Sequence, residues 1–454
     1  MKRFHSLLAG FALFPLSLAP LALLHGAATA GGGTPSRIIL TWSGDPATTQ
    51  SVTWRTASMA PSPQAQLAKF TADPGFEAGA STIKASAVMD DLGNGLTAAH
   101  YRADFRGLEP NTRYCYRVGD GESWSEWSFF RTASAKPDAF RFIYIGDAQN
   151  SIRSLWSRAI RSALLTAPDA RFVVHAGDLL AEGYDDRLWG EWSDALGFIG
   201  ATIPSFPVPG NHDLHRPPGR PDSKFVFSVS PLWHSHFALP TNGPDIPEMP
   251  GQSYYVDYQG VRMVALDVNV FANEDFEAAA KQRVREKQLA WLNQVLGNNS
   301  NRWTIVVQHQ PIYAVAKGRE YAEMRAALAP LYEKYGVDLV LQGHDHSYAR
   351  SHKVAAGKVV APDAPGVIYA VSVSGPKMYQ LDELHMKLMA QTYEKKQFFQ
   401  TIEVSPDLLK YTSYSIDGAV TDAFELRKRG AASTYVDHAP RQAAATSATA
   451  AGRL

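Results

Sequence analysis

Five short apolar runs along the chain each end in side chains that can bind a metal ion. The runs are RFIYIGDAQ, RFVVHAGD, SFPVPGNHD, WTIVVQHQP and DLVLQGHDH. The side chains at their ends are Asp147, Asp178, Asn211 with His212, His309, and His344 with His346. These donors are carboxylate, amide and imidazole groups, with no thiolate among them. Such a set favours Zn, Mn or Fe and argues against a closed structural zinc site of the cysteine type.

Each run is short and rich in Val, Ile, Leu or Phe, which predicts a buried strand. In open α/β sheets a ligand site lies just beyond the carboxyl ends of the strands. Five strand ends can therefore bring residues that are far apart in sequence to one place. A single GD or GNHD is most simply a turn. GHDH is the stronger signal, and chance does not readily give all five motifs in order, each after an apolar strand.

Residues 37–133 read as an all-β domain. RIILTW, SVTWRTA, YRADF, RYCYRV and WSFFRTA alternate in hydrophobicity and are separated by turn residues. The alternating stretch from Leu108 to Val118 resembles the tyrosine corner of a fibronectin type III-like sandwich. Its single cysteine, Cys115, is interpreted as a packed strand residue and excludes an intramolecular disulfide.

Residues 138–429 show strands alternating with helical patterns, which predicts α/β layering. One apolar helical face runs from Ile152 to Ala163, and a second runs from Tyr321 to Tyr335. Gly336 should end the second helix, and Pro330 inside it should kink or split it. The Pro-rich segment 216–251 is expected to be a long loop near the site.

The length and the two ends of the chain suggest a secreted two-domain protein. A chain of 454 residues exceeds what one core usually serves. Lys2 and Arg3, the apolar stretch 7–24 and Ala28-Thr29-Ala30 predict a signal peptide over residues 1–30, with secretion or a periplasmic location and no membrane attachment after cleavage. Residues 430–454 are rich in Ala, Ser and Thr, which predicts a disordered tail.

Charge gives no argument for a polyanionic partner. The chain has 44 Lys plus Arg and 44 Asp plus Glu, and removing Lys2 and Arg3 with residues 1–30 leaves 42 minus 44, or −2. We therefore expect no nucleic-acid partner. The oligomeric state does not follow from the sequence.

The order GD, GD, GNHD, strand-terminal His and GHxH resembles the calcineurin-like metallophosphoesterase superfamily. With the β-sandwich in front, the chain is similar to its purple acid phosphatase branch. The resemblance covers roughly residues 37–430. It implies a layered β-sandwich core flanked by helices for the second domain.

The resemblance also implies two metal ions, with Asp178 bridging them. Asp147 and His346 would complete the protein ligands of the first ion. Asn211, His309 and His344 would hold the second. A shared carboxylate offsets the repulsion between two cations, which lie ~3.5–4 Å apart in two-metal hydrolases. His212 is then placed to donate a hydrogen bond or a proton to the leaving oxygen.

Two positions depart from the purple branch. Ala181 stands where that branch has an iron-binding Tyr, and Tyr184 is displaced by three positions, so we expect no purple colour. Gln149 ends the first motif, where the branch has Gly and other members of the superfamily have a metal-binding His. It is interpreted either as a weak amide ligand or as a residue that orients water. The metal could accordingly be Fe, Zn or Mn.

Other polar residues near the motifs have less specific interpretations. The histidines that follow the fourth motif in the purple branch are replaced here by HQPIYAVAKGRE, which makes Lys317 and Arg319 candidate phosphate-binding residues or parts of a solvated loop. His175 is interpreted as a core or supporting histidine, and Asp345 as a supporting residue.

The leading hypothesis is a secreted phosphomonoesterase in which metal-bound hydroxide attacks a small phosphate ester. An alternative on the same site is cleavage of phosphodiesters or nucleotide pyrophosphates. An alternative of another class is a non-catalytic surface-binding module, which the sandwich domain would suit.

Overall fold

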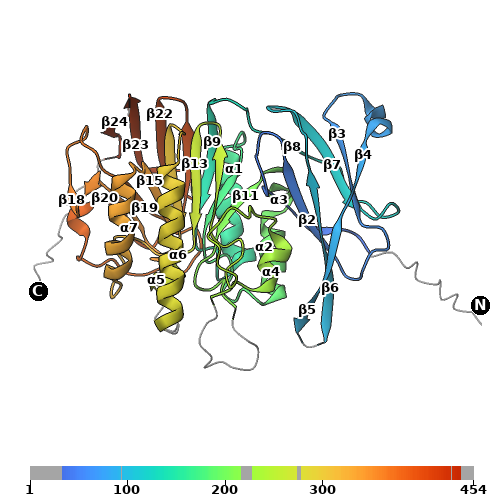
Figure 1. The fold of residues 1–454 in the computed structure, drawn as a ribbon, viewed down its shortest axis with the longest axis horizontal. Coiled ribbons are helices and arrows are strands. Elements are labelled where there is room, and N and C mark those ends of the chain that lie inside the picture. The colour runs from blue at the N-terminus through green and yellow to red at the C-terminus, as the bar shows by residue number, and fades with distance from the viewer. Residues whose placement is uncertain (1–32, 94, 216–226, 273–277, 431, 441–454) are drawn as a thin grey trace, which may run out of the picture. The chain divides into compact units, whose positions relative to one another are not determined.

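The protein is described by a computed structural model that covers residues 33–93, 95–215, 227–272, 278–430 and 432–440. The predicted signal peptide lies outside these residues. In the described part of the chain, no helix combines the length and the apolar character that a membrane span requires. Strands β1–β8 come first, and strands that alternate with helices follow (Figure 1).

The N-terminal region is a sandwich of two antiparallel sheets, as predicted. Its sheets have the orders β1-β2-β6-β5 and β4-β3-β7-β8. The strands are β1 (Ser36–Thr41), β2 (Gln50–Thr56), β3 (Gln64–Lys69), β4 (Ser81–Lys84), β5 (Ser86–Gly93), β6 (Leu96–Phe105), β7 (Arg113–Gly119) and β8 (Ser128–Arg131), with the short helix η1 (Pro74–Gly79) between β3 and β4. The backbone N–H of Glu109 donates to the Tyr114 hydroxyl over 2.9 Å, which is the contact of a tyrosine corner. Strands β3, β4 and β5 were not predicted, because β4 and β5 are largely exposed and β3 is only partly buried, with a single large apolar side chain at Leu67.

Two seven-stranded sheets form the core of the second region. The first has the order β11-β10-β9-β21-β22-β23-β24, and the second has the order β12-β13-β14-β15-β19-β16-β20. Strands of the first sheet are β9 (Phe140–Ile145), β10 (Val173–Ala176), β11 (Ser205–Val208), β21 (Phe398–Val404), β22 (Leu408–Ser415), β23 (Val420–Arg429) and β24 (Ala432–Asp437). Strands of the second sheet are β12 (Tyr254–Tyr258), β13 (Val261–Leu266), β14 (Trp303–Gln308), β15 (Leu339–Gln342), β16 (Tyr348–Ser351), β19 (Ile368–Val371) and β20 (Met389–Tyr393); β17 (Val354–Ala355) and β18 (Lys358–Val359) form a separate hairpin.

All five apolar runs are buried strands, but they belong to two sheets and not to one. Parallel strands β9, β10 and β11 carry the first three motifs, and parallel strands β14 and β15 carry the last two. The sheets are joined across their interface, where the Gln342 backbone N–H donates to the Tyr144 hydroxyl over 3.0 Å. The motifs therefore meet where the carboxyl ends of two facing sheets come together, and the layered β-sandwich core that the resemblance implied is confirmed.

Helices flank these sheets and bury the predicted apolar faces. They are η2 (Ile152–Trp156), α1 (Ser157–Thr166), α2 (Asp186–Leu196), α3 (Phe198–Thr202), α4 (Pro231–His236), α5 (Asn269–Ala272), α6 (Ala278–Gly297), α7 (Ala322–Lys334) and η3 (Met386–Leu388). Pro330 lies inside α7 and does not split it, because Met324, Leu328 and Tyr332 anchor the helix by burial on both sides. Gly336 follows with φ of 63°, as expected for a helix end.

Two segments that were predicted to be irregular contain regular structure. Helix α4 lies within the expected loop 216–251, where Ser230 accepts a hydrogen bond from the Leu232 N–H and begins the helix. Strand β24 lies within the expected tail 430–454 and pairs with β23. Burial of Tyr435 stabilises this strand, whereas the composition of the tail as a whole hid the short alternating stretch. Residues 441–454 lie outside the described residues.

Candidate metal centre

The backbone of the motif loops is held in an unusual conformation. Asp147, Asp178, His344 and His346 have φ values of 54°, 50°, 74° and 47°, in the left-handed region. Non-glycine residues in this region are strained, and such strain is concentrated at functional sites. The glycines of the motifs allow this close approach. A side chain at Gly210 would collide with the Asp178 carboxylate, and one at Gly343 would collide with the Asp147 carboxylate.

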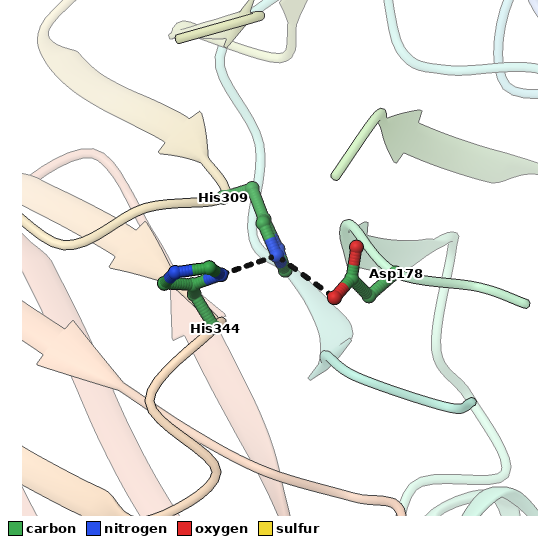
Figure 2. A group of neighbouring side chains, drawn as sticks. All are labelled: Asp178, His309 and His344. Atoms are coloured by element: carbon green, nitrogen blue, oxygen red, sulfur yellow. Dashed lines mark hydrogen bonds and ion pairs between the residues drawn. The ribbon is translucent and has the colours of Figure 1, made fainter. Parts of the chain in front are cut away.

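One group of possible ligands joins the two sheets. Asp178, His309 and His344 place one donor atom each within 4.8 Å of one another. His309 Nε2 lies 3.2 Å from Asp178 Oδ2 and 3.1 Å from His344 Nδ1 (Figure 2). The Nδ1–H of His309 donates to the Ala176 carbonyl over 2.8 Å, which leaves Nε2 free to face the other two donors.

A second group shares Asp178 with the first. Asp147, Asp178 and His346 also place their donor atoms within 4.8 Å of one another. The Nδ1–H of His346 donates to the Lys377 carbonyl over 3.0 Å and fixes the ring with Nε2 toward the centre. The Gln149 amide lies between the groups, with Nε2 2.8 Å from Asp178 Oδ2 and 3.2 Å from His346 Nε2.

The spacing and chemistry of these donors fit metal ions. Ligand atoms bound at ~2.0–2.2 Å to one ion lie roughly 2.9–3.5 Å apart, and the contacts around His309 fall in this range. Asn211 Oδ1 and Gln149 Oε1 are buried and have no hydrogen-bond partner among the described residues. Such unpaired buried oxygens are costly unless a ligand satisfies them. The unpaired Oε1 of Gln149 is available as a metal ligand, and its Nε2 donates to Asp178. Both roles suggested by the sequence, metal ligand and supporting residue, therefore stay open.

Buried negative charge makes the centre favourable for cations. Asp147 and Asp178 are 0% and 1% exposed. Burial, with a contribution from the Asp178 carboxylate, raises the pKa of Asp147 to about 8. Burial opposes ionisation of Asp178 as well, but the neighbouring His309 outweighs it and holds the pKa of Asp178 below its usual range. Burial also favours a neutral His309, whereas Asp178 and Asp147 raise its pKa to about 9. The two carboxylates therefore hold extra protons on Asp147 and His309 in the metal-free chain, and bound cations would replace this positive charge.

His212 lies beside the shared carboxylate. Its backbone N–H donates to Asp178 Oδ1 over 2.9 Å. Its Nδ1–H donates to the Ala181 carbonyl over 2.8 Å, so Nε2 is the nitrogen left for a substrate. The side chain is partly exposed. This position and orientation suit a group that donates a hydrogen bond or a proton.

Four further residues were singled out in the sequence, and the structure shows what each of them contacts. Lys317 is exposed, and its side chain forms no ion pair with another described residue. Arg319 donates to the His344 carbonyl, approaches Asp345 Oδ1 at 3.3 Å and lies over the Tyr379 ring at 4.7 Å. Asp345 accepts the N–H groups of residues 315 and 316 and so supports the loop after His309. His175 is buried against Trp192 and lies 3.3 Å from the Ser205 hydroxyl.

Asp213 and Tyr321 also belong to this region, and the sequence interpretation missed both. Asp213 Oδ2 accepts the Gly210 N–H over 2.8 Å, and its Oδ1 accepts the Leu179 N–H over 3.2 Å. It thereby ties the second and third motif loops together. Its place in GNHD was a usable signal, since a buried acid beside a proposed ligand often orients it. The Tyr321 hydroxyl lies 2.6 Å from His344 Nε2.

Comparison with known domains agrees with this geometry. Residues 35–132 match the purple acid phosphatase N-terminal domain, and residues 140–348 match the calcineurin-like phosphoesterase domain. The chain combines these two domains. The resemblance inferred from the motif order is thus confirmed.

Named relatives of the chain are phosphatases. The chain is 26% identical over 358 residues to acid phosphatase type 7 of the mouse, across 72% of this chain and 74% of that protein. It is 26% identical over 266 residues to a purple acid phosphatase of soybean (Glycine max), across 56% of this chain but only 53% of that protein. These matches confirm the predicted class, a metal-dependent phosphoester hydrolase, and count against a non-catalytic binding module.

Solved structures share the fold. A purple acid phosphatase from yellow lupin seeds is similar with a TM-score of 0.70 and 17% identity, across 87% of this chain and 75% of that chain. The structure of PhoD is similar with a TM-score of 0.64 and 14% identity, across 91% of this chain and 94% of that chain. The predicted order of an all-β domain followed by an α/β phosphoesterase fold is confirmed.

Proposed function

We propose that the chain is a secreted hydrolase of small phosphate monoesters that uses two metal ions. The observation that supports this best is the pair of overlapping donor groups that share Asp178. Asp147, Asp178 and His346 would hold one ion, with Gln149 beside them. Asn211, His309 and His344, together with Asp178, would hold the other.

The ions, when bound, would supply Lewis acidity and lower the pKa of a bound water. The residues of the chain supply the rest. Asp213 holds the two motif loops in register through the Gly210 and Leu179 N–H groups. His212, oriented by the Ala181 carbonyl, would donate a proton from Nε2 to the leaving oxygen. Nothing in this arrangement requires a covalent phosphoenzyme.

For Arg319 we propose a supporting role in place of the contact with phosphate that the sequence suggested. Its guanidinium already contacts the His344 carbonyl and Asp345, so we infer that it supports the ligand loop. Lys317 remains a candidate for contact with the phosphate because its side chain is exposed.

A comparison of two esters with the same leaving group tests the proposal. Initial rates of 4-nitrophenyl phosphate and bis(4-nitrophenyl) phosphate hydrolysis should be measured with Zn, Mn or Fe added to the metal-free full chain. We expect faster hydrolysis of the monoester. Faster hydrolysis of the diester would overturn the monoesterase assignment in favour of a phosphodiesterase, and no hydrolysis with any of these ions would overturn the proposed function.

A further inference from the structure

The three histidines of the centre are oriented in two different ways. The Ala176 carbonyl accepts the Nδ1–H of His309, and the Lys377 carbonyl accepts the Nδ1–H of His346. No side-chain substitution removes either contact. His344 is different, because its outward nitrogen, Nε2, faces the side-chain hydroxyl of Tyr321 at 2.6 Å.

The protonation of His344 decides whether it can bind an ion. His309 donates from Nδ1 to a carbonyl, which can only accept, so its inward Nε2 carries a lone pair when the ring is neutral. His344 Nδ1 faces that nitrogen at 3.1 Å. Both inward nitrogens can serve one cation only if the proton of His344 sits on Nε2. The Tyr321 hydroxyl, 2.6 Å from Nε2, is placed where an acceptor would stabilise this form.

We propose that Tyr321 is a positioning residue that accepts the Nε2–H of His344 and presents Nδ1 to the ion shared with Asp178 and His309. This inference rests on the proposed two-metal function and deepens it. Metal-binding histidines generally donate their other N–H to a fixed acceptor, which orients the ring and strengthens the ligand. Here that acceptor is a side chain from the segment just before α7.

The surrounding contacts hold Tyr321 in place. Asp345, next to His344, accepts the Val315 N–H over 2.6 Å and the Ala316 N–H over 3.0 Å. The Lys317 N–H donates to the Gln380 carbonyl over 2.8 Å. Arg319 donates to the His344 carbonyl. The segment that carries Tyr321 is thus bonded to the GHDH loop at several points, and the hydroxyl has a defined position relative to the His344 ring.

The arrangement predicts an effect confined to one ion. The site of Asp147 and His346 does not depend on Tyr321, because the Lys377 carbonyl orients His346. Removing the Tyr321 hydroxyl should therefore weaken the ion bound by His344 by about 10–100-fold, the usual cost of losing such a contact. The affinity for the other ion should change little.

Cobalt binding to the full chain tests this inference. Metal-free wild type, Tyr321→Phe and Tyr335→Phe should each be titrated with Co(II), with calorimetry for affinity and visible absorption for coordination. Tyr335→Phe is a matched control, because it removes one hydroxyl that contacts Asn293 at the far end of α7. His344→Gln identifies which absorption band and affinity belong to the ion in question.

We expect Tyr321→Phe to weaken and spectrally alter the same ion as His344→Gln, while Tyr335→Phe matches wild type. Wild-type affinities and spectrum in a folded Tyr321→Phe chain would overturn the inference. A wild-type chain that binds two cobalt ions but hydrolyses no phosphate ester would overturn the proposed function alone. A wild-type chain that binds no cobalt would overturn both.

Discussion

Two buried charged clusters follow one another along the same segment of chain, and they are built in opposite ways. The metal centre ends at His346, and four residues later Arg350 on β16 begins a second cluster. Arg350 donates to Asp422 over 2.6 and 2.9 Å, and both side chains are 0% exposed. The Tyr348 hydroxyl donates to the same carboxylate over 2.7 Å. Every charge in this Arg350 cluster thus has a partner within the protein.

The metal centre lacks that balance. Asn211 Oδ1 and Gln149 Oε1 are buried without a partner among the described residues, and Asp147 lies in strained backbone. Two buried carboxylates meet histidine nitrogens, and among the described residues neither carboxylate forms an ion pair with an arginine or a lysine. Burial of charge alone therefore does not mark a functional site. Unpaired buried oxygens beside residues with strained backbone mark such a site, whereas a fully paired cluster marks a structural one.

The comparison predicts the largest effect for Asp178→Asn. Because both donor groups use this carboxylate, turnover should fall by more than the ~10²–10³-fold cost of losing one donor from a typical active site. Metal content should fall as well. The metal-free chain should stay folded but lose some stability to urea, since the ionised Asp178 is the buried partner of His309 and its lowered pKa means that this charge stabilises the fold. Asp194→Asn, at an exposed acid paired with Arg153, serves as the control. Persistent turnover in Asp178→Asn would show that this residue does not bridge two ions.

Arg350→Met should lower stability and leave metal binding intact. Leaving Asp422 buried without its partner should cost about 3–5 kcal/mol of unfolding free energy, measured by urea denaturation. Metal content per folded chain should be unchanged. The double variant Arg350→Met with Asp422→Leu should recover part of the loss, because no unpaired charge remains. A loss of metal without a loss of stability in Arg350→Met would contradict a purely structural role of the Arg350 cluster.

His212→Asn should separate proton donation from metal binding. The shorter amide can still donate to the Ala181 carbonyl but has no counterpart of Nε2. Turnover of a monoester with a poor leaving group should fall by roughly 10²–10⁴-fold at wild-type metal content. A loss below tenfold in steady-state assays would rule out His212 as the proton donor.

The smallest effect concerns His175, which is buried near the centre but packs as a structural residue. Burial lowers its pKa to about 3. The unfolded chain therefore takes up a proton as the pH falls below ~6.5, whereas the folded chain does not until pH ~3, so acid destabilises the fold. Between pH 7 and 5 this one group should cost about 2 kcal/mol.

Urea unfolding of metal-free wild type and His175→Gln at both pH values measures this cost. The variant should lose about 2 kcal/mol less than wild type on acidification. Equal losses in the two proteins would mean that His175 titrates normally in the folded chain.

Much of the fold could be read from local pattern. The five motif strands are short, apolar and bounded by glycine, and each of these signals is local. The paired sheets, by contrast, are a long-range property. Nothing within WTIVVQ or FRFIYI indicates that β14 and β9 lie in different sheets, because both are buried on each face.

The donor residues were also readable, whereas their supports were not. Asp147, Asp178 and His309 follow predicted strands, so topology alone brings them close. Tyr321 is brought to His344 by the path of a loop, and hydroxyl contacts across 23 residues leave no periodic signal. Strand β24 was missed for a related reason, since Tyr435 is stabilised by packing on Phe424 and not by the composition of its segment.

We propose that seven side chains assemble one site that binds a pair of cations and cleaves phosphate esters. Elemental analysis of the purified full chain, run beside monoester hydrolysis before and after chelation, tests it most directly. We expect about two ions per chain, loss of turnover on chelation and its return with Zn, Mn or Fe. A folded chain that carries no ions and hydrolyses the monoester at an undiminished rate in chelator would contradict it.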